Sequence, residues 1–99
     1  MTMNRQILKK ARKLSRKYSL ARISEDKTEN GKIIWFAEDL DLIGCMAQGD
    51  TEEEARSNLE DNRVDFVYFL LEDGMDVPPP TTHEDLWNAY DKRHALTKK

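Results

Sequence analysis

The apolar positions of this 99-residue chain follow two periods, one helical and one alternating. Near the N-terminus they recur every three or four residues, which is the repeat of a helix with one apolar face. We predict a helix over residues 3–17, with basic side chains on the rest of its surface. Because the stripe is narrow, this helix needs another surface to pack against. The stripe consists of Met3, Ile7, Ala11, Leu14 and Tyr18.

Three segments with the properties of short strands follow. Residues 18–24 alternate between two faces, residues 32–38 are aromatic and β-branched, and residues 43–48 form a third apolar segment. Residues 25–31 are a turn-rich connector in which Asn30-Gly31 is a strong hairpin signal. The short connections predict an antiparallel three-stranded sheet.

The adjacent aromatics Trp35 and Phe36 occupy the second strand. Side chains of a strand alternate between its two faces, so only one of the two can face a covering helix. The other lies on the opposite face, where an exposed aromatic is a good anchor for an interface.

A second helix is predicted from Thr51 to Gly74. Thr51 and Glu54 have the spacing of a capping box, and glycine suits the position just after a helix. Its apolar stripe, which contains one polar interruption at Asn62, is Ala55, Leu59, Asn62, Phe66, Phe69 and Leu70.

Residues 64–71 of this helix are apolar nearly all round. A sheet covers one side only, so the N-terminal helix, the C-terminal tail or another subunit must cover the other. The candidate residues for contact between copies are Phe66, Val67, Phe69 and Leu70. After the three prolines at 78–80, Thr81 or Thr82 can cap a last short helix that carries Leu86, Trp87, Tyr90 and Leu96.

These elements predict one α+β domain over residues 1–99: a basic helix (1–17), a core (18–80) and a tail (81–99). The single cysteine excludes a disulfide within the chain, and no apolar stretch approaches the length of a membrane helix. We therefore expect a soluble cytoplasmic protein. Cys45 is expected to be a buried structural residue, and His83 and His94 to be surface residues without a metal or cofactor.

The net charge of -3 conceals an asymmetry. Residues 1–24 carry eight basic side chains and no acid, whereas residues 25–99 carry eight basic and all 19 acidic side chains. A basic arm on an acidic body suggests two different partners, or an arm that docks onto another copy. The arm can contact nucleic-acid phosphates, for which the candidates are Lys9, Arg12, Lys13 and Arg16.

Four acids raise the alternative of a metal-dependent nuclease, because two-metal nucleases need several converging carboxylates. They lie in connectors and at a helix cap, which favours turns, caps and an acidic surface over catalysis. An acidic face would complement a basic partner and speed its encounter. The four acids are Glu38, Asp39, Asp41 and Asp50. The candidate contacts for such a partner are Trp35, Glu38, Asp39 and Asp41.

Residues 35–55, W-F-A-E-D-L-D-L-I-G-C-M-A-Q-G-D-T-E-E-E-A, carry a recognisable pattern. An aromatic strand leads through a Gly-Cys pair and a Gly-Asp-Thr turn into a long helix, and then to a glycine and a proline-rich end. The pattern resembles the HicB antitoxin family of bacterial HicA/HicB toxin–antitoxin pairs. The matching positions are Asp39-Leu40, Ile43-Gly44-Cys45, Ala47, Gly49-Asp50-Thr51, Glu54-Ala55, Glu72-Asp73-Gly74 and Pro78-Pro79-Pro80.

The resemblance covers about residues 18–80 and implies a partial ribonuclease-H-like β-β-β-α core with a short fourth strand. It implies a homo-oligomeric, non-enzymatic antitoxin that binds and masks a small basic ribonuclease toxin, HicA. Many family members bind operator DNA through a C-terminal domain. Here only residues 81–99 follow the prolines, and Asp41-Leu42 stands where the family often has proline. The alternative function is therefore a nucleic-acid-binding regulator that acts through the basic N-terminal helix.

Overall fold

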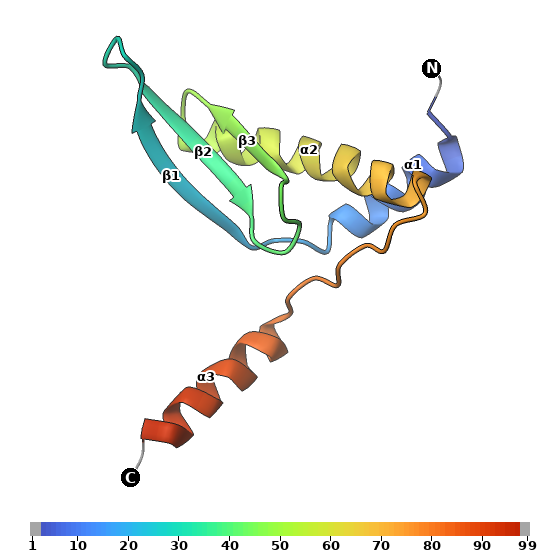
Figure 1. Cartoon of the computed structure of the whole chain (residues 1–99), viewed down its shortest axis with the longest axis vertical. Coiled ribbons are helices and arrows are strands. Elements are labelled where there is room, and N and C mark those ends of the chain that lie inside the picture. The colour runs from blue at the N-terminus through green and yellow to red at the C-terminus, as the bar shows by residue number, and fades with distance from the viewer. Residues whose placement is uncertain (1–2, 98–99) are drawn as a thin grey trace.

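The long helix α2 (Glu52–Glu72) lies across one face of a three-stranded antiparallel sheet (Figure 1). The computed structural model describes residues 3–97, and the side-chain environments of residues 3–92. The sheet has the order β1 (Ala21–Lys27), β2 (Ile33–Asp39) and β3 (Met46–Gly49). This is the predicted α+β architecture. Within residues 3–97, no helix covers the other face of the sheet.

Helix α1 (Arg5–Ser15) packs along α2. Ala11 and Tyr18 of the predicted apolar stripe are buried, and Ile7 and Leu14 pack against the same core. Four of the five predicted stripe positions therefore pack as expected, but Met3 is exposed and the helix is shorter than the predicted range of 3–17. Helix α1 supplies the cover that the second half of α2 requires. The two helices are also joined at the N-cap of α1, where the Asn4 N–H donates to the Tyr68 hydroxyl at 2.8 Å.

The first strand begins later than predicted. The prediction of a strand over 18–24 and a connector over 25–31 is wrong, because Glu25 to Lys27 pair with Ile33 to Trp35. The turn itself is short: the Thr28 N–H donates to the Lys32 carbonyl at 2.8 Å, and Gly31 has a positive φ of 81°. Charged residues are tolerated in β1 because it is an edge strand that exposes them to solvent.

The third strand also begins later, at Met46 rather than at residue 43. The Asp39 carboxylate accepts the N–H groups of Asp41 and Leu42 at 2.8 and 2.7 Å, which bends the chain into a turn directly after β2. Gly44 completes the turn with a φ of 97°. Side-chain hydrogen bonds, rather than strand propensity, therefore set this boundary.

The predicted ends of α2 are confirmed. Thr51 is the N-cap and accepts the Glu54 N–H at 3.0 Å, and Gly74 follows the C-cap with a φ of 70°. Beyond it, the extended residues 75–82 form no strand in the described chain, so the expected fourth strand is absent there. The Tyr18 hydroxyl donates to the Pro78 carbonyl and fixes this segment to the body.

The last element is α3 (His83–Thr97), which projects away from the rest of the molecule (Figure 1). Thr82 caps it, because the Asp85 N–H donates to the Thr82 hydroxyl and the Thr82 N–H donates to the Asp85 carboxylate. Thr81 is not the cap and instead bonds to Asp41. Leu86, Trp87 and Tyr90 are exposed on α3. The side chain of Leu96 lies outside the described residues.

Candidate partner-binding groove

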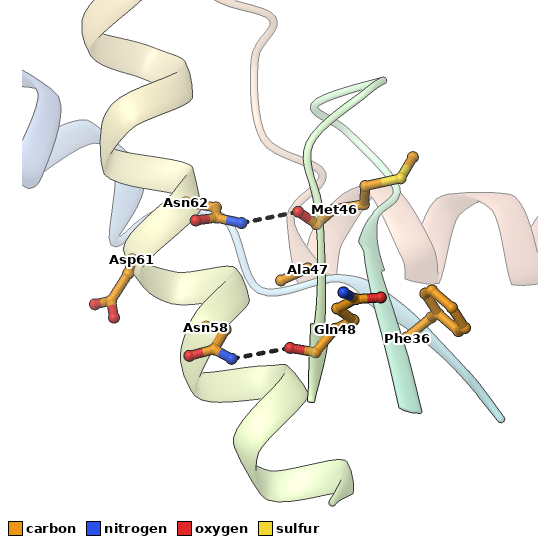
Figure 2. A pocket seen from close by; sticks show the side chains of 7 residues that line it. All are labelled: Phe36, Met46, Ala47, Gln48, Asn58, Asp61 and Asn62. Atoms are coloured by element: carbon orange, nitrogen blue, oxygen red, sulfur yellow. Dashed lines mark hydrogen bonds between the residues drawn. The ribbon is translucent and has the colours of Figure 1, made fainter. Parts of the chain in front are cut away.

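Two asparagines of α2 cap the free edge of β3. Asn58 and Asn62 lie one helical turn apart, and their side-chain N–H groups donate to the carbonyls of Gln48 and Met46, each at 2.9 Å (Figure 2). Four residues of helix rise about 6 Å and two residues of strand about 6.6 Å, so the spacings match. The two amides thus replace part of a fourth strand at this edge.

A groove follows the same edge, between α2 and the uncovered face of the sheet. Its first part has a volume of about 510 Å³ and its second part, toward the C-terminal half of α2, about 240 Å³. Met46 and Asn62 line both parts, so the groove is continuous. The remaining lining residues are Phe36, Ala47, Gln48, Asn58, Asp61, Gly44, Cys45, Asp65, Phe66 and Phe69.

The groove combines apolar and acidic chemistry. Met46 and Phe69 are 55% and 54% exposed, and the neighbouring loop residue Ile43 is 87% exposed. Asp65 lies on α2 beside Phe66 and Phe69 in the second part of the groove. Asp61 lies at the rim, and Figure 2 shows its carboxylate pointing away from β3. Large exposed apolar side chains next to carboxylates suit a protein partner with a basic surface around an apolar anchor.

The expected separation of the two aromatics is confirmed, and Trp35 is the one that faces the helix. Trp35 shares the helix-facing side of β2 with buried Ala37 and packs against the core. Phe36 lies on the opposite face and lines the groove. Trp35 was the residue expected to contact a partner, but the register of β2 turns it toward the core, and Phe36 is the aromatic that lies on the uncovered face.

Asp39 does not belong to an acidic surface, and its expected contact with a partner is wrong. It is 1% exposed, and its Oδ2 accepts from the Nε of Arg63 at 2.6 Å. Glu38 does lie on the uncovered face, where it pairs with Arg22 at 3.3 Å. Asp41 is half-buried and accepts the backbone N–H and the hydroxyl of Thr81 at 2.8 and 2.6 Å. Only Glu38 of the three acids is therefore available at the sheet surface.

Arg63 is the interior residue that the sequence pattern missed. It is 7% exposed, and its Nη2 is buried without a hydrogen-bond partner. The buried residues of α2 at every fourth position are Ala55, Leu59, Arg63 and Val67, whereas Asn62 faces the groove. The i, i+4 spacing of Arg63 within this stripe was the available signal.

Cys45 lies in the same interior region and is a buried free thiol, as expected. Burial raises the pKa of this thiol to about 11, the charge of Asp39 acts in the same direction, and Arg63 opposes both. A thiol with this pKa is a poor nucleophile at neutral pH.

The candidate residues for contact between copies divide into two groups. Val67 is fully buried, so its expected role at such an interface is wrong: the core beneath α2 encloses it. Phe66 and Phe69 reach the groove, and Leu70 is half-buried.

The four basic candidates lie together on α1 and its C-cap residue Arg16. All four side chains are exposed and line one shallow depression of about 720 Å³, on the side of α1 away from its buried stripe. The depression is lined by Arg5, Leu8, Lys9, Arg12, Lys13 and Arg16. The structure therefore gathers them into one basic face, defined by these six residues.

The acids weighed as a nuclease centre are dispersed. Asp39 bonds to Arg63, Asp41 to Thr81, and Asp50 to Lys32 at 3.1 Å. Within residues 3–97 no cluster of three or more His, Cys, Asp and Glu side chains could hold a metal ion. His83 is exposed, and the side chain of His94 lies outside the described residues.

Comparison of the chain with protein-family models, with curated proteins and with solved structures found no match. Among the described residues, no helix has the length and apolar character required to cross a bilayer. The proposed function accordingly rests on the geometry of the groove and of the basic face, together with the sequence pattern of residues 35–55.

Proposed function

We propose that this chain is a binding protein of the HicB antitoxin type, which masks a small basic RNA-cleaving toxin of the HicA type. The observation that carries the proposal is the groove between β3 and α2, where exposed Met46 and Phe69 line the same part of the groove as Asp65. The resemblance of residues 35–55 to the HicB pattern supplies the class of the partner. The proposal places the protein in the cytoplasm, the compartment of its RNA-cleaving partner.

The mechanism is steric and electrostatic masking. Apolar side chains of the groove anchor the toxin, because burial of such surface supplies most of the affinity of a protein interface. The acidic body attracts the basic toxin and raises the rate of encounter. The bound toxin cannot then present the surface that contacts RNA. The chain itself needs no catalytic group for this function.

Co-expression with a HicA-type toxin tests the proposal. The wild-type chain should restore growth and co-purify with the tagged toxin. Absence of both rescue and complex would remove the antitoxin proposal.

Two variants locate the contact. Phe69→Ala removes an exposed anchor and Asp65→Lys reverses a groove charge, and each should weaken toxin binding at least about tenfold. Matched controls are Met75→Ala, an exposed apolar residue beyond the end of α2, and Glu29→Lys, an exposed acid in the β1–β2 turn. Wild-type affinity in both groove variants would place the toxin elsewhere.

A second function is favoured by the basic face of α1. Its guanidinium and ammonium groups lie on one exposed side of a helix, an arrangement that neutralises phosphates without reading sequence. Double-stranded DNA should bind in a salt-sensitive manner, and Lys9→Gln/Arg12→Gln should weaken binding more than Lys10→Gln/Lys17→Gln. The control pair removes the same charge from positions that do not line this face. An equal loss of DNA affinity in the two double variants, or unchanged DNA mobility with wild-type protein, would exclude nucleic-acid binding by this face.

A further inference from the structure

The two edges of the sheet differ in whether side chains cap their backbone groups. The β3 edge is capped by Asn58 and Asn62. β1 forms the other edge, and none of the described helices or strands lies beside its free side (Figure 1). A bare edge strand presents N–H and C=O groups on which another strand can pair. The β1 edge is therefore the place where this sheet can be extended.

The hydrogen-bond pattern shows which residues of β1 face this edge. The Leu40 N–H donates to the Leu20 carbonyl and the Thr28 N–H to the Lys32 carbonyl, so even-numbered residues of this strand bond to β2. The backbone groups of the odd-numbered residues consequently point outward. These residues are Ala21, Ile23, Glu25 and Lys27.

The charged side chains of β1 are arranged so that two antiparallel copies of the strand attract each other. Arg22 and Asp26 lie on the uncovered face of the sheet, two residues before and two residues after Ser24. Asp26 reaches the free edge, since its Oδ1 accepts the outward N–H of Lys27 at 2.8 Å. When two such strands run antiparallel, the positive end of each meets the negative end of the other.

We propose that β1 pairs antiparallel with β1 of a second copy, around a two-fold axis at Ser24, to give a continuous six-stranded sheet. In this register Ala21 and Ile23 form hydrogen-bonded pairs with Lys27 and Glu25 of the second copy. The Lys27 N–H exchanges its bond to Asp26 for the Ala21 carbonyl of the second copy, which frees the Asp26 carboxylate. Arg22 of each copy lies opposite Asp26 of the other. The interface is isologous, as the symmetry of a dimer requires.

Other registers are less favourable. If the pairing shifts by two residues so that the two-fold axis lies at Glu25, Glu25 faces Glu25 of the second copy. Like charges directly opposite each other are destabilising. If the pairing shifts by two residues in the other direction, so that the axis lies at Ile23, Arg22 faces Ser24 and both Arg22–Asp26 pairs are separated. The alternating charges thus favour one partner strand and one register while discouraging indiscriminate strand addition. This proposal is independent of the proposed function, because β1 does not line the groove.

The test uses two full-length variants, Arg22→Glu and Asp26→Lys, in sedimentation velocity experiments across a concentration series. Each variant alone places like charges opposite each other and should self-associate at least about tenfold more weakly than wild type. Mixed together, they restore both charge pairs, so the mixture should form a dimer of twice the 11.6 kDa chain mass. Circular dichroism checks the fold of each, because Arg22→Glu also removes the exposed pair with Glu38.

Two proline variants test the backbone hydrogen bonds between the paired β1 strands. Glu25→Pro removes an N–H that points outward, so the fold should persist while the dimer is lost. Ser24→Pro removes an N–H on the side that bonds to β2 and should destabilise the monomer as well. Three results would each overturn the proposal: a wild-type chain that is monomeric at every concentration, single variants that associate like wild type, or a mixture that does not combine.

Discussion

The carboxylate of Asp39 and the guanidinium of Arg63 meet at 2.6 Å in the interior, with side chains 0% and 8% exposed. Asp39 ends β2 and Arg63 lies at the centre of α2, so the pair joins the sheet to its covering helix. The same carboxylate accepts the N–H groups of Asp41 and Leu42. One side chain therefore fixes the end of a strand, the turn that follows it and the position of the helix.

Removal of one member of this pair should be severely destabilising. Asp39→Ala leaves a buried guanidinium without its counter-charge and two turn N–H groups without an acceptor, and should cost about 3–5 kcal/mol in free energy of unfolding. Arg63→Met should cost less, because Asp39 keeps its two N–H donors. Urea unfolding measures both. Glu38→Ala removes an exposed ion pair as the control and should cost under about 1 kcal/mol. An equal cost for Asp39→Ala and Glu38→Ala would show that the buried pair contributes little.

The stripe of α2 shows why the sequence did not reveal this pair. The helical repeat predicts Asn62 as the polar position in an otherwise apolar face. An arginine is rarely buried unless it is paired, so its residue type does not indicate Arg63 as an interior residue. The actual buried position is Arg63, and its partner lies 24 residues earlier in the chain. No local period identifies that partner. The same limit applies to Asn58 and Asn62, whose hydrogen bonds to β3 depend on where α2 lies over the sheet.

Local chemistry, in contrast, was sufficient to predict the ends of α2 and the apolar stripe of α1 apart from Met3. Thr51 and Gly74 act through neighbours within a few residues, so their roles can be predicted without tertiary information. The predicted strand boundaries were wrong because they depend on tertiary pairing. Glu25 and Asp26 have low strand propensity and belong to β1 only because they pair with β2.

Gly49 is expected to control how closely β3 approaches α2. A Cβ at this position would lie 2.6 Å from the Ala55 backbone nitrogen and 2.9 Å from the Glu54 carbonyl carbon, and backbone atoms cannot move as a flexible side chain can. Gly49→Ala should therefore cost about 1–3 kcal/mol in urea unfolding. Gly31→Asn is the matched control, because that site has open space and asparagine tolerates its positive φ. The control should be close to wild type, and a similar stability for Gly49→Ala would contradict the close contact.

The asparagine cap on β3 predicts a change in both stability and association. Asn58→Ala/Asn62→Ala removes two hydrogen bonds to strand carbonyls and should cost about 1 kcal/mol for each. It also uncovers an edge that can pair with other strands, so light scattering should increase with protein concentration. Ser57→Ala, an exposed neighbour on α2, is the control. Loss of stability without increased association would mean that the two amides support the fold but do not protect the edge.

The buried thiol of Cys45 predicts a loss of stability at alkaline pH. Its pKa is raised from 9.0 to about 11 in the folded chain, chiefly by burial. The unfolded chain therefore loses the thiol proton first as the pH rises, which favours unfolding. The contribution is fully present below about pH 9 and declines between pH 9 and 11, by at most about 3 kcal/mol.

Urea unfolding of wild type and Cys45→Ala from pH 8 to 11 separates this contribution from the tyrosines. The pKa of Tyr18 is also raised by burial and by the charges of Asp39 and Asp41, but both proteins retain that residue. Cys45→Ala should begin less stable at pH 8, because it leaves a small cavity. Its stability should then fall less steeply than that of wild type, so the two curves converge toward pH 11. Parallel curves would show that the thiol ionises as readily in the folded chain as in the unfolded one.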